Sequence, residues 1–248
     1  MAVLTLPLQS RTAVFGCIAL QALALYTLAS FRHQSIWICI VAFFAGGFLT
    51  DWISGLAHFG FDYVWPPRFP IMGPIAVEFR EHHEDPTLDP SAVLTNFTKA
   101  AYGTIPIAAA TCLVASLWHD SLLAFGIGAI LFATSVWMLG FHQIHSYAHM
   151  GSKLPAEEFN RAVAEIGNLP TERQQRTEFA RLFDRVGIPP AVRFLQRSRL
   201  FLRPEIHWRH HRSFESDFSS VNGWSDPVMN WLYRPIARRK KAAQPATA

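Results

Sequence analysis

The sequence has few charged residues and few cysteines, and each shortage excludes a class of protein. Only 16% of its 248 residues are charged, whereas half are apolar. An average soluble domain carries about 25% charged residues, so this balance argues against a water-soluble or disordered chain. The three cysteines, Cys17, Cys39 and Cys112, are far apart and form no Cys-x-x-Cys pair, which excludes a disulfide scaffold and a thiolate metal site. We expect all three to be buried apolar side chains.

Four apolar stretches are each close to the roughly 20 residues that cross a bilayer as a helix. They lie near residues 12–31, 36–56, 100–118 and 121–141, and short turns join the first to the second and the third to the fourth. The long polar regions must therefore share one side of the membrane. Only Arg32 of the 22 basic residues falls on the other side. Because loops rich in lysine and arginine stay inside, we expect the polar regions to face the cytoplasm.

The polar regions differ in their predicted structure. The loop at 62–99 contains six prolines, so we expect it to be mostly irregular. Residues 153–203 are expected to form a helical insert, in which Thr171 and Gln174 make a capping box. An apolar stripe follows at helical spacing: Phe179, Leu182, Phe183 and Val186. The helix after Pro190 mixes apolar residues with arginines that suit the lipid headgroup layer: Arg193, Arg197, Arg199 and Arg203.

Eight of the eleven histidines fall into four groups that the span layout brings to the cytoplasmic face. The groups are His58 with Asp62, His82 with His83, His145 with His149, and His207 with His210 and His211. Residues three or four apart share one face of a helix, so the members of three groups can converge on a metal. Adjacent His82 and His83 point about 100° apart and serve two ions more easily than one.

The number of candidate ligands favours two metal ions over one. Eight imidazoles and the Asp62 carboxylate exceed the four ligands of a zinc site, but they suit two irons that keep positions open for oxygen. Asp51 is expected to hydrogen-bond a histidine rather than bind metal. Four further carboxylates are expected to orient the imidazoles: Glu78, Glu81, Glu84 and Asp85.

Three histidines stand apart from these groups. His33 and His119 are single and lie on the far side, so we interpret them as surface side chains. His142 lies one turn before His145 and is left open as a tenth candidate. The predicted fold is all-α: one polytopic membrane domain over residues 1–248, with four transmembrane helices and a cytoplasmic histidine-rich cap.

The sequence around the histidines resembles the CarF/Kua lipid desaturase family, which consists of membrane histidine-box di-iron desaturases. The family includes plasmanylethanolamine desaturase and a plant plastid desaturase acting on phosphatidylglycerol. The resemblance covers about residues 36–236. Four motifs carry it in order: Asp51-Trp-Ile-Ser-Gly-Leu-Ala-His58, Phe79-Arg-Glu-His82-His83-Glu-Asp-Pro86-Thr, Gln143-Ile-His145 with His149, and His207-x-x-His210-His211. Two departures are His142, where relatives have Asn or another residue, and the segment 153–195, which is longer than in the animal plasmalogen enzymes.

The resemblance implies a non-haem di-iron centre, molecular oxygen as co-substrate, a phospholipid substrate and a separate electron donor such as cytochrome b5 or ferredoxin. We expect an oxidoreductase that converts the 1-O-alkyl chain of an ether lipid to a vinyl ether, as in plasmalogen formation. A fatty-acyl desaturase or hydroxylase of the same class remains open, as do a zinc-dependent membrane lipid hydrolase and a non-enzymatic metal- or haem-binding protein. No nucleic acid partner is expected.

Overall fold

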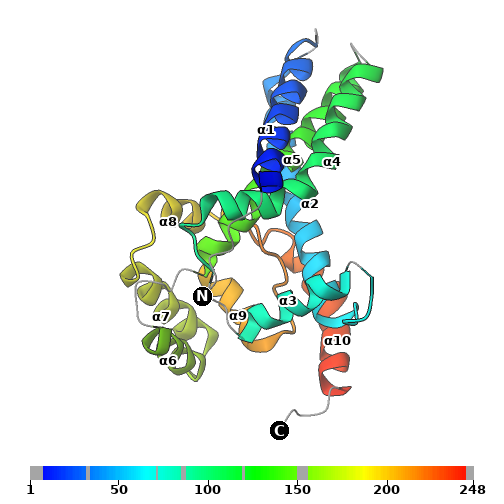
Figure 1. Cartoon of the computed structure of the whole chain (residues 1–248). Helices are drawn as coiled ribbons and strands as arrows, with labels where there is room; N and C mark the ends of the chain where they lie inside the picture. Colours follow the sequence, from blue (N-terminus) through cyan, green and yellow to red (C-terminus); the bar gives the residue numbers. More distant parts are fainter. Residues whose placement is uncertain are drawn as a thin grey trace. The chain divides into compact units, whose positions relative to one another are not determined.

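The structure is a computed structural model that describes residues 8–31, 34–70, 72–84, 88–118, 121–149 and 156–243. Every regular element in these ranges is a helix, which confirms the predicted all-α fold (Figure 1). In chain order the helices are α1 (Leu8–Ala29), α2 (Ile36–Tyr63), α3 (Met72–Glu84), α4 (Val93–Leu117), α5 (Leu122–Ala148), α6 (Ala156–Gly167), α7 (Glu172–Arg185), α8 (Pro190–Arg197), α9 (Pro204–Ser213) and α10 (Asp226–Ala243).

Four of these helices, α1, α2, α4 and α5, are long and apolar enough to cross a membrane. The predicted spans are therefore confirmed, although their ends differ. Helix α2 continues past the predicted end at Leu56 to Tyr63, and α5 continues past Phe141 to Ala148. His58 and His145 therefore lie on helical continuations of the second and fourth spans, as their spacing predicts.

The chain divides into two compact units, and the division falls within α2 and α5. The first unit comprises residues 1–50 and 91–143, and the second comprises residues 51–90 and 144–248. All nine candidate metal ligands belong to the second unit. The interpretation of the whole chain as a single membrane-embedded domain stays a prediction.

In the first unit, hydroxyl groups of the spanning helices are satisfied within their own helix. Thr104 donates to the carbonyl of Ala100 at 2.8 Å, and Thr134 donates to that of Ile130 at 2.8 Å. Such bonds let polar side chains stay in a helix without reaching for water. Gly46 provides a close approach between α2 and α5, because a Cβ added there would lie 2.6 Å from the Thr134 nitrogen.

The cysteines are only partly as predicted. Cys17 is buried, Cys112 is half-buried and Cys39 is exposed. The expectation that all three are buried is therefore wrong for Cys39. The physical reason is that an apolar side chain on a spanning helix can face lipid tails, so low polarity does not imply burial inside the protein.

The expectation that residues 62–99 are mostly irregular is wrong, because α3 occupies part of this loop. Pro74 lies in the first turn of α3, where its missing N–H removes no helical hydrogen bond. The residues from Ile75 to Glu84 contain neither proline nor glycine, so the helix continues through His82 and His83. Helix α4 also begins earlier than predicted, at Val93.

The predicted helical insert is present as α6, α7 and α8. The Thr171 hydroxyl accepts the backbone N–H of Gln174 at 3.2 Å and so caps α7, as the capping box predicts. The predicted apolar stripe is buried and packs with Trp208 of α9 in one hydrophobic cluster. The insert thus has a core of its own that supports α9.

One arginine of the insert is not where the sequence placed it. Arg193 is buried, and its guanidinium lies 2.9 Å from both the Asp184 and the Glu205 carboxylates. The expectation that this side chain meets lipid headgroups is therefore wrong. A buried guanidinium needs paired carboxylates, and α7 and α9 supply them.

Candidate metal centre

The predicted ligands come together in two groups of four. His82, His149, His207 and His211 form the first group, and His58, Asp62, His83 and His210 form the second. Within each group the potential ligand atoms all lie within 4.8 Å of one another. His82 and His83 belong to different groups, which agrees with their divergent directions on a helix.

His145 is the ninth predicted residue, and it lies against the first group. Its Nε2 is 2.8 Å from the Nε2 of His207 and 3.1 Å from that of His149. The Nε2 of His207 is also 2.8 Å from that of His149 and 3.1 Å from that of His211. A ring nitrogen carries at most one proton, so hydrogen bonds cannot satisfy three such contacts at one atom. Lone pairs converging in this way need a shared cation.

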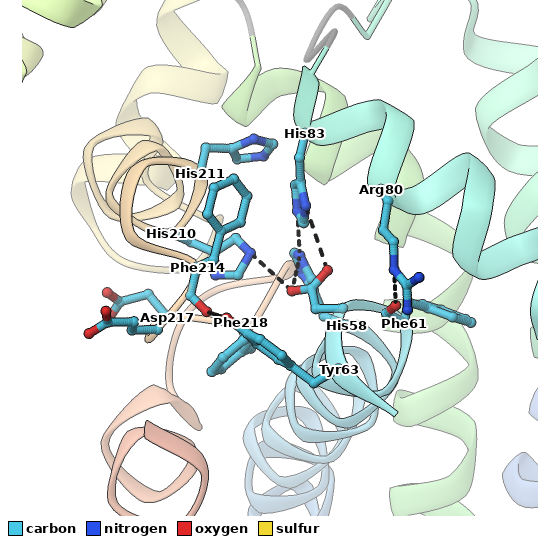
Figure 2. A network of polar contacts seen from close by, with 12 residues as sticks. His58, Phe61, Tyr63, Arg80, His83, His210, His211, Phe214, Asp217 and Phe218 are labelled. Carbon is cyan, nitrogen blue, oxygen red and sulfur yellow. Dashed lines mark hydrogen bonds and ion pairs between the residues drawn. The ribbon is translucent and has the colours of Figure 1, made fainter. Parts of the chain in front are cut away.

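The second group surrounds the Asp62 carboxylate. His210 Nε2 is 3.5 Å and His83 Nδ1 is 3.6 Å from its oxygens, and His58 Nε2 is 3.8 Å away. Figure 2 shows His58, His83 and His210 pointing toward one another from three different helices. Neither Asp62 oxygen has a hydrogen-bond partner among the described residues, although the side chain is only 5% exposed. A cation held between these donors would stabilise the buried carboxylate.

Helix α9 supplies ligands to both groups. It begins with Pro204, a residue that favours the first helical position, and it ends at Ser213, with Phe214 as the C-cap residue. Phe214 has φ 56°, a conformation that costs a bulky residue about 1–2 kcal/mol. The Tyr63 hydroxyl holds it there by donating to its carbonyl (Figure 2). The helical path confirms the predicted i, i+3, i+4 face of His207, His210 and His211.

The segment after α9 fixes two ligand rings from outside the second group. His210 Nδ1 lies 2.8 Å from the Ser216 carbonyl, and His58 Nδ1 lies 3.2 Å from the Ser220 hydroxyl. An Nδ1–H that donates outward leaves the Nε2 lone pair facing inward, as metal-binding histidines require. Nothing in the local sequence marks Ser216 and Ser220 as neighbours of these two histidines.

Asp51 holds this segment in place, which corrects the expectation that it bonds a histidine. Its Oδ1 accepts the backbone N–H groups of Val221, Asn222 and Gly223 at 3.2, 2.9 and 3.1 Å. Its Oδ2 accepts the N–H of Ser225 at 2.9 Å and its hydroxyl at 2.8 Å. The fully buried carboxylate is thus satisfied by five donors from one loop. Its sequence separation from that loop left no signal that could have revealed the role.

Arg80 is a further residue that the sequence reasoning missed. Its Nε donates to the Phe61 carbonyl at 2.9 Å (Figure 2), and its Nη2 donates to the Trp65 carbonyl at 2.9 Å. The Phe61 carbonyl lies in the last turn of α2 and has no intrahelical partner, so Arg80 satisfies it while tying α3 to the end of α2. This contact sets the position from which His82 and His83 reach the two groups.

Burial keeps the imidazoles neutral. Burial and then the neighbouring histidines lower the pKa of His149, His207 and His211 well below its ordinary value. Burial lowers the pKa of His83 to about 2 and that of His210 to about 4. Neutral imidazoles keep the lone pair that binds a metal, so these side chains are ready ligands at neutral pH.

Asp217 is ionised, in contrast to the neutral imidazoles. Burial alone raises its pKa, but two 2.6 Å hydrogen bonds from Arg209, with help from Ser216 and Asn230, lower the pKa below its ordinary value. Asp217 therefore stays ionised and fixes the outer face of α9 to the following loop.

Several predicted residues do not join the groups. His142 belongs to neither group. His33, His119 and Asp85 lie outside the described residues, and so does the side chain of Glu84. Glu78 and Glu81 are both exposed, and their role in orienting the imidazoles stays a prediction.

The residues present fit two transition-metal ions. Two donors at right angles on an ion 2.1 Å away are about 3.0 Å apart, and opposite donors are about 4.2 Å apart. The Nε2 separations of 2.8 to 3.1 Å match the spacing of donors at right angles. The donor set of imidazoles and one carboxylate suits iron, and the nine donors together exceed what one four-coordinate zinc uses.

Comparison with known proteins identifies the family. A model of the lipid desaturase domain matches residues 47–178. Plasmanylethanolamine desaturase of Myxococcus xanthus is 25% identical over 237 residues, covering 92% of this chain and 69% of that protein. Plasmanylethanolamine desaturase 1 of Mus musculus is 39% identical over 74 residues, covering 29% of this chain and 27% of that protein. No solved structure matches the chain.

These matches confirm the resemblance inferred from the histidine motifs. The family match covers more than half of the chain and includes the ligands on α2, α3 and α5. The match to the Myxococcus protein covers 92% of this chain and so extends beyond the residues that the family model matches. The chain therefore belongs to the lipid desaturase domain family and, with four helices that can cross a membrane, is an integral membrane protein of that family.

Proposed function

We propose that this protein is an oxygen-dependent desaturase that acts on a glycerophospholipid chain at a centre of two irons. The single observation that carries the proposal is the convergence of seven imidazoles and one carboxylate into two groups of ligand spacing, with the His145 ring against the first group. The family match and the names of the two relatives support lipid desaturation as the reaction.

The proposed ligands are the nine predicted residues: His58, Asp62, His82, His83, His145, His149, His207, His210 and His211. Two bound irons would supply oxygen activation and an oxidising strength that no side chain has. The chain's own residues hold the ions, keep the imidazoles neutral and orient the rings through Ser216 and Ser220. Burial excludes water from the ligand groups, which protects an oxidising site from side reactions.

We further propose the 1-O-alkyl chain of an ether phospholipid as the substrate and a vinyl ether as the product, by analogy with the names of the relatives. Lipid mass spectrometry of cells with and without the chain tests this. The expected product is two hydrogens lighter than an ether lipid, and mild acid cleaves it because vinyl ethers are acid-labile. An acid-stable product that has lost two hydrogens from an acyl chain would identify an acyl desaturase, and a product that has gained oxygen would identify a hydroxylase.

Metal analysis separates the proposal from a zinc hydrolase. Purified protein is expected to contain two irons per chain, and one tightly held zinc with no iron would overturn the di-iron assignment. Haem absorbance would instead favour a haem-binding protein.

We also propose that the ligand groups face the cytoplasm, as the distribution of basic residues predicts. A cysteine introduced at Arg239, which is exposed on α10, provides the test. A membrane-impermeant maleimide should label it only after the cells are permeabilised. Labelling in intact cells would reverse the orientation.

A further inference from the structure

A pocket of about 400 Å³ lies between α7, α9 and α10, on the second unit. Phe179, Ile206 and Trp208 give it an apolar floor. Its lining also contains five arginines and only two glutamates. The arginines are Arg176, Arg203, Arg209, Arg212 and Arg234, and the glutamates are Glu172 and Glu205.

The two glutamates are already engaged. Glu205 lies 2.9 Å from the buried Arg193, and Glu172 lies 2.9 Å from Arg176 and 3.8 Å from Arg209. The other three arginines of the lining make no ion pair within the described part of the chain: Arg203, Arg212 and Arg234. The pocket therefore presents an excess of positive charge to whatever meets it.

Helix α9 is the wall between this pocket and the ligand groups. At about 100° per residue, Arg209 and Arg212 lie on the face of α9 opposite His207 and His211. Trp208 lies on the flank between the two faces. It lines the pocket, and its ring centroid is 5.7 Å from that of His149 and 5.5 Å from that of His211. The pocket is thus separated from the candidate centre by one helix, which is about 10–12 Å across.

The proposed reaction needs electrons from outside the substrate. Desaturation removes two hydrogens, and two more electrons and two protons are required to reduce one O₂ to two waters. The balance is O₂ + –CH₂–CH₂– + 2 e⁻ + 2 H⁺ → –CH=CH– + 2 H₂O. The described residues hold no group that stores these electrons, so a carrier must approach the centre closely.

We propose that the arginine-lined pocket is the docking site of an acidic one-electron carrier protein, an inference that rests on the proposed desaturase function. Charge complementarity selects an acidic surface, and the single helix between pocket and ligands gives a short route with Trp208 at its inner end. A substrate headgroup fits this place less well. With α9 between the pocket and the candidate centre, a lipid whose headgroup sat there would not extend its chain to the ligands.

The test measures binding separately from catalysis. The full chain is placed in nanodiscs of phosphatidylcholine, without metal and with iron, and titrated with an acidic [2Fe–2S] ferredoxin as the probe. One variant reverses three exposed pocket arginines: Arg176→Glu, Arg212→Glu and Arg234→Glu. The control reverses three exposed arginines of α7 and α10 that lie outside the pocket lining: Arg173→Glu, Arg185→Glu and Arg239→Glu.

The pocket variant should bind ferredoxin about tenfold or more weakly than the control variant, with or without iron. Added salt should weaken binding to the unmodified chain and have little effect on the pocket variant. Equal losses in both variants, or no binding to the unmodified chain, would overturn the docking site. Loss of binding to a short-chain anionic phospholipid, with ferredoxin affinity unchanged, would also overturn it and assign the pocket to lipid.

A chemical reductant distinguishes this inference from the proposed function. Iron-loaded protein reduced anaerobically with dithionite and then exposed to oxygen bypasses docking, so the pocket variant should form as much desaturated lipid as the unmodified chain. Absence of product from both proteins would refute the desaturase, while the binding titration still decides the docking site. Product loss in the pocket variant under these conditions would mean that the arginines support folding or substrate, which overturns the docking role.

Discussion

Replacing Asp51 by Asn should loosen the loop that positions two ligand histidines. The amide oxygen can still accept from Val221, Asn222 and Gly223, but the amide nitrogen now faces the N–H of Ser225. One charge-assisted hydrogen bond to that N–H is lost, at about 1.5–3 kcal/mol, and a buried donor is left unsatisfied, at about 1–3 kcal/mol. The expected loss is about 3–5 kcal/mol, a large part of the roughly 5–15 kcal/mol that stabilises a typical domain.

Hydrogen exchange followed by mass spectrometry is the direct assay. A loss of about 3 kcal/mol corresponds to at least about 100-fold faster exchange of the amides at 221–225, since each 1.4 kcal/mol is tenfold. Ser54→Ala is the graded control, because Ser54 gives the same loop only one neutral bond, from the Ser220 N–H at 3.1 Å. Its effect should be about 1 kcal/mol.

The Asp51→Asn variant should weaken metal binding at the second ligand group more than at the first. The loop orients His58 and His210 through Ser220 and Ser216, and the loss of such partners typically lowers metal affinity about 10–100-fold. In the first group, the Nδ1 atoms of His149, His207 and His211 have no hydrogen-bond partner among the described residues, so this loop does not orient those rings. Unchanged exchange at 221–225 would refute the role of Asp51, and equal weakening of both ions would refute its selectivity for the second group.

Three further perturbations test the site and the fold. His145→Ala should lower iron content and abolish product while His142→Ala, one turn away on the same helix, leaves iron content unchanged; equal loss in both would remove the distinction between them. Gly46→Ala should lower the melting temperature in detergent by overpacking worth about 1–3 kcal/mol, because the added Cβ would lie 2.6 Å from a backbone nitrogen of α5. Gly126→Ala should leave the melting temperature unchanged, because a Cβ added there has no atom within 4 Å. Similar shifts of the melting temperature in both variants would contradict the packing argument. Asp217→Asn should cost about 2 kcal/mol at neutral pH. Because the folded-state pKa of Asp217 is lowered, the stability it provides is present above the ordinary value of 3.8 and is lost as the pH falls through the folded value. Melting curves of the two proteins should therefore converge in acid, and a gap that persists there would contradict the ionised pair.

Much of the site could be predicted because its information is local. Helical spacing placed His145 with His149 and His207 with His210 and His211, and the span layout brought His58 to the same end of the chain's helical hairpins. The cap at Thr171 was also predictable, since a capping box lies within four residues. Each of these inferences needed only the periodicity of one helix and the thickness of a bilayer.

The remaining features depend on contacts that no local pattern encodes. Helix α3 was missed because Pro74 was interpreted as a break rather than as a first-turn residue. The partners of Asp51 lie far along the chain at 221–225. Those of Arg80 are backbone carbonyls, which every residue has, so residue type gives no signal for them. Interactions with backbone groups can be recognised only once the chain path is known.

The way the two groups share elements explains where these supports lie. Helix α3 gives His82 to one group and His83 to the other, and α9 gives His207 and His211 to the first group and His210 to the second. A shift of α9 would therefore move donors of both ions at once, and neither group could adjust alone. The Arg209–Asp217 pair, the strained Phe214 and the Asp51-bound loop all act on α9 or on the residues that follow it. Stabilising contacts are thus concentrated on α9, which together with α3 sets the spacing between the two groups.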